Sequence, residues 1–204
     1  DRYRSPLTEV GVDVKVGDYV LAVDGVELRA DEDPYRQLRH KADRAVEMTV
    51  NATPTLEGAR KVVFRPISSE ADLFYLQFVL KNRARVDQLS QGRLAYVHIP
   101  DMDSEGLIEF SRTWFAQAAV PPTGVVGMVV DIRDNGGGWV SQLIVARVAR
   151  RVWAYQFPRQ GAPETYPSRA VNGPSVVLID QNAGSDGDIF PESIRIRGLA
   201  PLIC

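Results

Sequence analysis

The chain has 204 residues, of which 45% are hydrophobic and 25% charged, a balance typical of globular domains and not of disordered or fibrous chains. Its 24 basic and 26 acidic side chains give a formal charge of −2, which excludes the net positive field of a nucleic-acid binder, and its apolar stretches fall short of the roughly 18–20 residues that span a bilayer. The single cysteine, Cys204, excludes an internal disulfide and a Cys/His metal cluster and is compatible with a reducing cytosol.

Residues 1–67 carry short strand patterns separated by tight-turn signals such as Asp24-Gly25. Between the strands, Pro34 opens the segment PYRQLRHKA, whose apolar residues fall on one helical face. The sequence therefore predicts a small β-barrel with one helix. Its strands are expected at 19–23, 26–28, 45–50 and 61–67.

The order of these elements, with the stretch GVDVKVGDYVLAVDG, resembles a PDZ domain of the bacterial protease type. In that family the strand and loop that capture a peptide C-terminus lie before the segment SPL, and little of that part precedes Ser5 here. We therefore assign 1–67 as a PDZ-like domain that is incomplete at its N-terminal end.

A connecting helix is predicted over 68–92, because Ser69 and Asp72 have capping-box spacing and an apolar stripe continues to about Leu89. From Arg93 onward, strands that are apolar nearly throughout alternate with helices, which predicts a parallel sheet covered on both faces. The strands are expected at 93–100, 125–133 and 175–180, and the helices at 104–119, 139–153 and after Gly187. The last residues, LAPLIC, read as a strand cut short, so we expect this α/β core, 93–204, and the chain itself to be truncated.

The first candidate site is the turn DIRDNGGGWVSQ, 131–142, which follows a buried strand and precedes a helix. Three successive glycines, Gly136 to Gly138, let the backbone present its N–H groups closely to a ligand, and a helix N-terminus favours negative charge. The arrangement suits an oxyanion. A turn that serves packing alone is the alternative, whereas a phosphate loop or dinucleotide fingerprint is excluded by the spacing.

The second candidate site is NAGSDGDIF, 182–190, again between a strand and a helix. Ser185 would lie on a sharp turn with its hydroxyl projecting, as in a nucleophile elbow. The alternative is a helix cap, in which Ser185, Asp186 or Asp188 only accepts backbone N–H groups of the following helix.

The segments NGGGWVSQLI and AGSDGDIF, joined by a stretch containing YQFPRQG, resemble the core of the tricorn proteases and, more loosely, the carboxyl-terminal processing proteases. Both are serine peptidases of a Clp-protease or crotonase-like fold, and the resemblance covers almost the whole chain. It implies that Ser185 is the nucleophile and that the backbone N–H groups of Gly138 and Asp186 form the oxyanion hole. It also implies that Gly137 and Gln156 contact substrate.

In the tricorn family an aspartate stands at the Gln156 position and favours basic substrate side chains, so the neutral amide predicts weaker selectivity for Lys or Arg. A serine nucleophile also needs a histidine base. The two histidines of the chain, His40 in a charged segment and His98 in a strand, are better explained as a surface residue and a packed core residue. The resemblance implies that the base histidine and a supporting glutamate lie outside these 204 residues, so the fragment alone should lack turnover.

The leading hypothesis is thus a cytoplasmic serine peptidase acting on short peptides, with no metal or organic cofactor and, by resemblance, a homo-oligomeric, hexameric ring. A non-catalytic PDZ module on a degenerate protease fold is the main alternative, and acyl-CoA chemistry ranks last. Four carboxylates at strand ends are expected to be solvated turn residues or caps, and Trp139 either roofs the cleft or packs the helix start. These carboxylates are Asp101, Asp103, Asp131 and Asp134.

Overall fold

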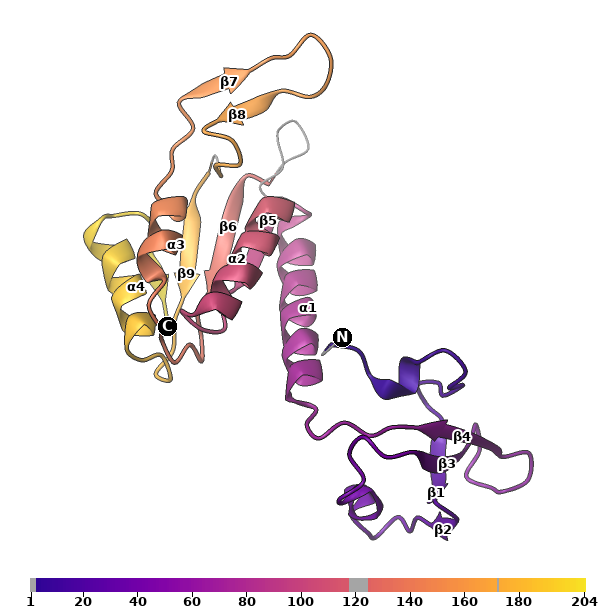
Figure 1. Cartoon of the computed structure of the whole chain (residues 1–204). Coiled ribbons are helices and arrows are strands. Elements are labelled where there is room, and N and C mark those ends of the chain that lie inside the picture. Colours follow the sequence, from indigo (N-terminus) through magenta and orange to yellow (C-terminus); the bar gives the residue numbers. More distant parts are fainter. Residues whose placement is uncertain (1–2, 118–124, 172) are drawn as a thin grey trace. The chain divides into compact units, whose positions relative to one another are not determined.

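A computed structural model describes residues 3–117, 125–171 and 173–204 of the chain (Figure 1). The chain divides into two compact units, Asp1–Gln77 and Phe78–Cys204, which we call the first and second units. Among the described residues, the helices are all too short or too polar to cross a membrane.

The first unit is built on a four-stranded antiparallel sheet in the order β2-β1-β3-β4. Its core consists of Met48 and Val50 on β3 and Val62 on β4, all buried. The strands are β1 (Tyr19–Val23), β2 (Val26–Glu27), β3 (Val46–Asn51) and β4 (Arg60–Phe64). The four predicted strands are confirmed to within one or two residues at most ends, because the turn signals and apolar positions that define them are local.

The helix predicted to start at Pro34 is a short 3₁₀-helix, η2 (Pro34–Leu38), and a 3₁₀ turn, η1 (Pro6–Thr8), lies nearer the N-terminus. Asp33 caps η2 by accepting the Tyr35 N–H at 3.0 Å. The helix ends there because Arg39 has a non-helical ψ of 133° and His40 has a φ of +61°, so the backbone cannot propagate helical hydrogen bonds.

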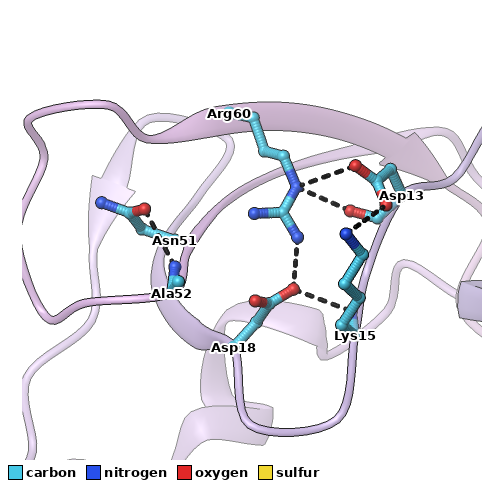
Figure 2. A network of polar contacts seen from close by, with 6 residues as sticks. All are labelled: Asp13, Lys15, Asp18, Asn51, Ala52 and Arg60. Atoms are coloured by element: carbon cyan, nitrogen blue, oxygen red, sulfur yellow. Dashed lines mark hydrogen bonds and ion pairs between the residues drawn. The ribbon is translucent and has the colours of Figure 1, made fainter.

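A network of polar contacts holds the turn before β1 against β4 (Figure 2). Arg60 donates to the Asp13 carbonyl at 2.8 Å and forms an ion pair with Asp18. Asp18 also accepts the Lys15 N–H at 2.7 Å. This backbone hydrogen bond is the main cause that lowers the pKa of Asp18; burial opposes it, and the Arg60 guanidinium acts in the same direction as the hydrogen bond. The charges of the first unit thus stabilise a surface turn.

The second unit is a parallel sheet in the order β10-β9-β6-β5, flanked by helices (Figure 1). Every residue of the central strand β6 is buried, so both faces of the sheet are covered, as predicted. Helix α1 (Ala71–Ser90) begins in the first unit and continues into the second. The further elements of the sheet and its helices are β5 (Leu94–His98), α2 (Ser104–Gln117), β6 (Gly127–Asp131), α3 (Ser141–Val148), β9 (Ser175–Leu178), α4 (Asp186–Ile196) and β10 (Leu202–Ile203).

Helix α3 ends at Val148, five residues before the predicted end at Trp153. The reason is tertiary: the Trp153 N–H donates to the Tyr166 carbonyl at 3.1 Å and their rings pack edge to face, so the chain enters a hairpin instead. This hairpin, β7 (Ala154–Gln156) and β8 (Glu164–Tyr166), lies partly in the segment predicted to be irregular, 157–174. Residues 118–119 of the predicted helix 104–119 lie outside the described residues.

One face of the sheet carries the main apolar core, and the other carries a polar cluster beneath α1. Asp131 is fully buried; it accepts the Tyr96 hydroxyl at 2.7 Å and both Nε and Nη2 of Arg133, at 2.9 and 2.5 Å. The prediction that Asp131 is a solvated turn residue is therefore wrong. Burial opposes ionisation of Asp131, but the hydrogen bonds from Arg133 and Tyr96 outweigh it and lower its pKa.

Candidate active site

Two turns meet at the carboxyl edge of the parallel sheet. The first runs from the end of β6 to the start of α3, and the second from the end of β9 to the start of α4. Because β6 and β9 are adjacent parallel strands, both turns emerge at the same end of the second unit, away from the β7–β8 hairpin (Figure 1). This is the edge where open α/β sheets place ligands.

The first turn contains Gly136 to Gly138, and we call it the glycine turn. It is fixed by backbone hydrogen bonds to Met102. The Met102 N–H donates to the Gly137 carbonyl at 2.8 Å, and the Met102 carbonyl accepts the Trp139 N–H at 2.6 Å. These bonds lie on either side of Gly138 and use neither its N–H nor its carbonyl. A Cβ at Gly138 would lie 2.1 Å from the Met102 carbonyl oxygen, so only glycine permits this approach.

Ser185 occupies the N-cap position of α4 with a φ of 54° and a ψ of −123°. Positive φ is costly for a residue with a side chain, and such strain gathers at functional sites. The Ser185 side chain makes no capping hydrogen bond. The Asp186 N–H is the first of the helix and therefore has no intrahelical acceptor.

The structure brings the two turns into contact. A Cβ placed on Gly137 would lie 2.7 Å from Ser185 Cβ and 2.9 Å from the Asp186 nitrogen. Gly137 itself has a φ of +99°, so both its conformation and its surroundings require glycine. The serine and the glycine turn, predicted separately, thus share one site.

Asn135 joins the turns, and the sequence analysis did not single it out. It is fully buried; its side chain donates to the Ile99 carbonyl and accepts the Gly137 N–H, each at 2.9 Å. Its carbonyl accepts the Gly184 N–H at 3.1 Å. The only signal in the sequence was an amide side chain directly before the three glycines. The sequence analysis also did not predict that the side chains of Ser141 and Asp186 are in contact.

Gln156 does not lie with the other predicted site residues. It is an exposed residue of β7, in the hairpin at the opposite end of the second unit (Figure 1). The connection after the hairpin is anchored there, because the Trp114 indole donates to the Arg169 carbonyl at 2.9 Å from near the end of α2. Helix α2 starts beside the glycine turn and has 14 residues, which is about 20 Å at 1.5 Å per residue.

Within the second unit, His98 is not brought to Ser185. His98 ends β5, which β6 separates from β9, so two strand spacings of about 4.8 Å intervene. Its Nε2 lies 3.2 Å from the Arg133 carbonyl and its ring packs edge to face on Phe78. Burial lowers the pKa of His98, although Asp131 acts in the opposite direction. His40 belongs to the first unit.

The structure also places the carboxylates at the start of α2 and Trp139, which the sequence analysis had considered. Asp101 is the carboxylate that accepts N–H groups at the start of α2, from Asp103 at 2.8 Å and Gly106 at 2.9 Å, whereas the sequence favoured Asp103 as the cap. Trp139 is 86% exposed, so it does not pack the start of α3. Within the described ranges, His, Cys, Asp and Glu side chains form no group of three that could hold a metal.

Comparison with known proteins matches residues 1–69 to the tricorn protease PDZ domain and residues 93–204 to peptidase family S41. The chain is 38% identical over 200 residues to tricorn protease homolog 1 of Streptomyces coelicolor and 34% identical over 200 residues to the tricorn protease of Thermoplasma volcanium. These alignments cover 98% of this chain but 18% and 19% of those proteins, so the chain spans about a fifth of their length. A crystal structure of the tricorn protease is similar to the chain, with a TM-score of 0.88 and 32% sequence identity. The match covers 99% of this chain and 19% of the chain in that crystal structure.

Proposed function

The chain belongs to peptidase family S41, and we propose that it supplies the nucleophile and the oxyanion hole of a serine peptidase that hydrolyses short peptides through an acyl-enzyme. The observation that carries this proposal is the contact between the two turns, with a Gly137 Cβ position 2.7 Å from Ser185 Cβ. One substrate carbonyl at this contact would meet the serine hydroxyl and the amides around it.

In this mechanism Ser185 Oγ attacks the scissile carbonyl carbon, and the carbonyl oxygen becomes an oxyanion. The N–H groups of Gly138 and Asp186 donate to that oxygen. Because Asp186 begins α4 and Gly138 lies just before α3, both amides add the positive end of a helix to this stabilisation. Loss of one such donor typically costs about 3–4 kcal/mol in the transition state. Collapse of the tetrahedral intermediate expels the amine, and water then releases the acyl group.

The serine proton requires a base, and His98, the histidine of the second unit, does not lie beside Ser185. His98 is held by the Arg133 carbonyl and Phe78, away from β9. We therefore place the base histidine and its supporting glutamate outside the 204 residues, and expect the isolated chain to lack turnover while the full-length protein is active. A cytoplasmic location is part of the same proposal, which the free, exposed Cys204 supports.

The remote position of Gln156 supports a homo-oligomer. Since its hairpin projects away from Ser185 of the same chain, Gln156 would reach a substrate only in the site of a second copy, as in a ring of subunits. Its neutral amide would then give weak selectivity for basic residues. Matched peptides ending in Arg and in Leu should be cleaved at similar rates by the full-length protein; a strong preference for Arg would contradict this role.

A fluorophosphonate probe tests the nucleophile directly. We expect the full-length protein to form one stoichiometric adduct, mapped by mass spectrometry to Ser185, and the Ser185→Ala variant to form none and to lose peptide hydrolysis. Adduct formation at another serine, with none at Ser185, would overturn the assignment. A non-catalytic module is not favoured, because Ser185 is strained and its side chain does not cap α4.

A further inference from the structure

One pair of buried side chains joins the two turns and has no role in the mechanism above. The Asp186 carboxylate accepts the Ser141 N–H at 2.9 Å and the Ser141 hydroxyl at 2.5 Å. Asp186 is 7% exposed and Ser141 is 6% exposed. The two residues lie 45 positions apart, so only the folded second unit brings them together.

Ser141 is the first residue of α3, and the residue before it does not cap the helix. Val140 occupies the N-cap position and makes no side-chain hydrogen bond. The first N–H groups of a helix need acceptors from elsewhere. Asp186 supplies one from the opposite turn, so a single carboxylate fixes the starts of both α3 and α4.

Ser185 lies between two such attachments. On its N-terminal side the Gly184 N–H donates to the Asn135 carbonyl at 3.1 Å, and on its C-terminal side Asp186 is held by Ser141. A strained backbone conformation persists only where its surroundings over-determine it. Here the residues before and after the strained serine are tied to the beginning and the end of the same glycine turn.

We infer that Ser141 and the Asp186 side chain are positioning residues for the reaction. They hold the Ser185 hydroxyl and the Asp186 amide in register with the Gly138 amide, and neither side chain touches substrate. This inference rests on the proposed function. An error of about 1 Å in such a geometry can cost a factor of about 100 in rate. A helix cap with no positioning role would affect stability alone.

Three variants of the full-length protein test this role through the rate of fluorophosphonate labelling at Ser185, measured well below each unfolding transition. Ser141→Ala removes one of the two hydrogen bonds and should slow labelling by about 10- to 100-fold. Asp186→Ala removes both and should slow it further. Asp186→Asn should slow labelling least, because the asparagine amide can accept the Ser141 backbone N–H and donate to the Ser141 hydroxyl oxygen. For peptide hydrolysis, kcat should fall with KM unchanged.

Ser90→Ala is the matched control. Ser90 is 7% exposed and its hydroxyl accepts the Leu94 N–H at 3.0 Å, but it ends α1, at the edge of the sheet where β5 begins. We expect it to lose stability and to keep the wild-type labelling rate.

The labelling results distinguish a failure of the positioning role from a failure of the peptidase proposal. A wild-type protein without an adduct at Ser185 would refute the peptidase proposal. A labelled wild type whose Ser141→Ala variant reacts at the same rate would refute the positioning role and leave the peptidase proposal intact. Ser141→Ala keeps the backbone hydrogen bond to Asp186, so it remains decisive where Asp186→Ala does not fold.

Discussion

The two units use glycine for different purposes. In the first unit, Gly11, Gly17, Gly25 and Gly58 all have positive φ, and a Cβ on any of them would meet no atom within 4 Å. In the second unit, six glycines leave less than 3.0 Å for a Cβ, because another backbone or side chain already lies there. They are Gly106, Gly127, Gly137, Gly138, Gly173 and Gly187. Glycine serves turn conformation in the first unit. The second unit has turn glycines as well, such as Gly198, but it alone adds glycines that permit close approach.

Charged groups differ between the units in the same way. The ion pairs of the first unit, such as Lys61 with Glu47, are largely exposed, and the Arg60 network holds a surface turn (Figure 2). In the second unit Asp131 is fully buried among its partners. Three of the six crowded glycines, 137, 138 and 187, gather with buried Asn135 and Asp186 at one edge of the sheet. Crowded glycines and buried polar groups therefore mark the edge where the chemistry is proposed.

The largest difference in Ser185 labelling should appear between two variants that each replace a glycine by alanine, one in each unit. Gly137→Ala places a Cβ against Ser185 and the Asp186 nitrogen, and we expect labelling of Ser185 to fall by at least about 100-fold. Gly58→Ala meets open space at a φ of +75°, so it should cost about 1–2 kcal/mol of local stability and leave labelling unchanged. Equal labelling of the two variants would remove the distinction between the units.

The next largest effect should come from losing a carboxylate inside the sheet, Asp131, compared with losing one in the turn before β1, Asp18, whose side chain is 7% exposed. Asp131→Ala removes the acceptor of the Tyr96 hydroxyl and the ion-pair partner of Arg133. We expect the free energy of unfolding to fall by about 2–4 kcal/mol, less than for a fully buried pair because Arg133 can turn to solvent. Hydrogen exchange of the β5 and β6 amides in the full-length protein measures it. Asp18→Ala in the first unit should loosen only its own turn. A comparable loss from Asp18→Ala would contradict the contrast.

Acid should destabilise the second unit through His98. Burial lowers its pKa in the folded chain, so the unfolded chain takes up the proton first. The stability present above about pH 6.5 is lost as the pH falls through the folded pKa. Opening of β5, measured by hydrogen exchange corrected for its intrinsic pH dependence, should become easier between pH 7 and pH 5. The His98→Gln variant should flatten this dependence, and an unchanged slope would assign it to other groups.

The smallest effect is expected for an exposed pair in the first unit. The Lys61 ammonium lies 2.8 Å from Glu47 Oε1, with 66% of the lysine side chain exposed. Lys61→Ala should cost less than about 1 kcal/mol, and the difference should vanish near 1 M salt. A loss as large as that of Asp131→Ala would show that surface pairs matter as much as the buried one.

The sequence predicted the four strands of the first unit and a parallel sheet with strands near β5, β6 and β9, because apolar alternation, buried runs and glycine signals act over a few residues. It predicted neither the order of the strands in the sheets nor the β7–β8 hairpin. It also pointed to both turns, since each follows an apolar strand. It did not predict the end of α3 or the 3₁₀ turn at Pro34, which depend on a hairpin partner and on left-handed residues beyond Leu38.

Local patterns by themselves determined that Ser185 lies on a strand-to-helix turn and that three glycines follow a buried strand. Only the tertiary structure decided that Gly137 packs against Ser185, that Asp186 binds Ser141, and that Gln156 lies at the far end of the unit. The reason is physical: backbone conformation follows from neighbouring residues, whereas a contact between residues 45 or more positions apart depends on how parallel strands align in the sheet.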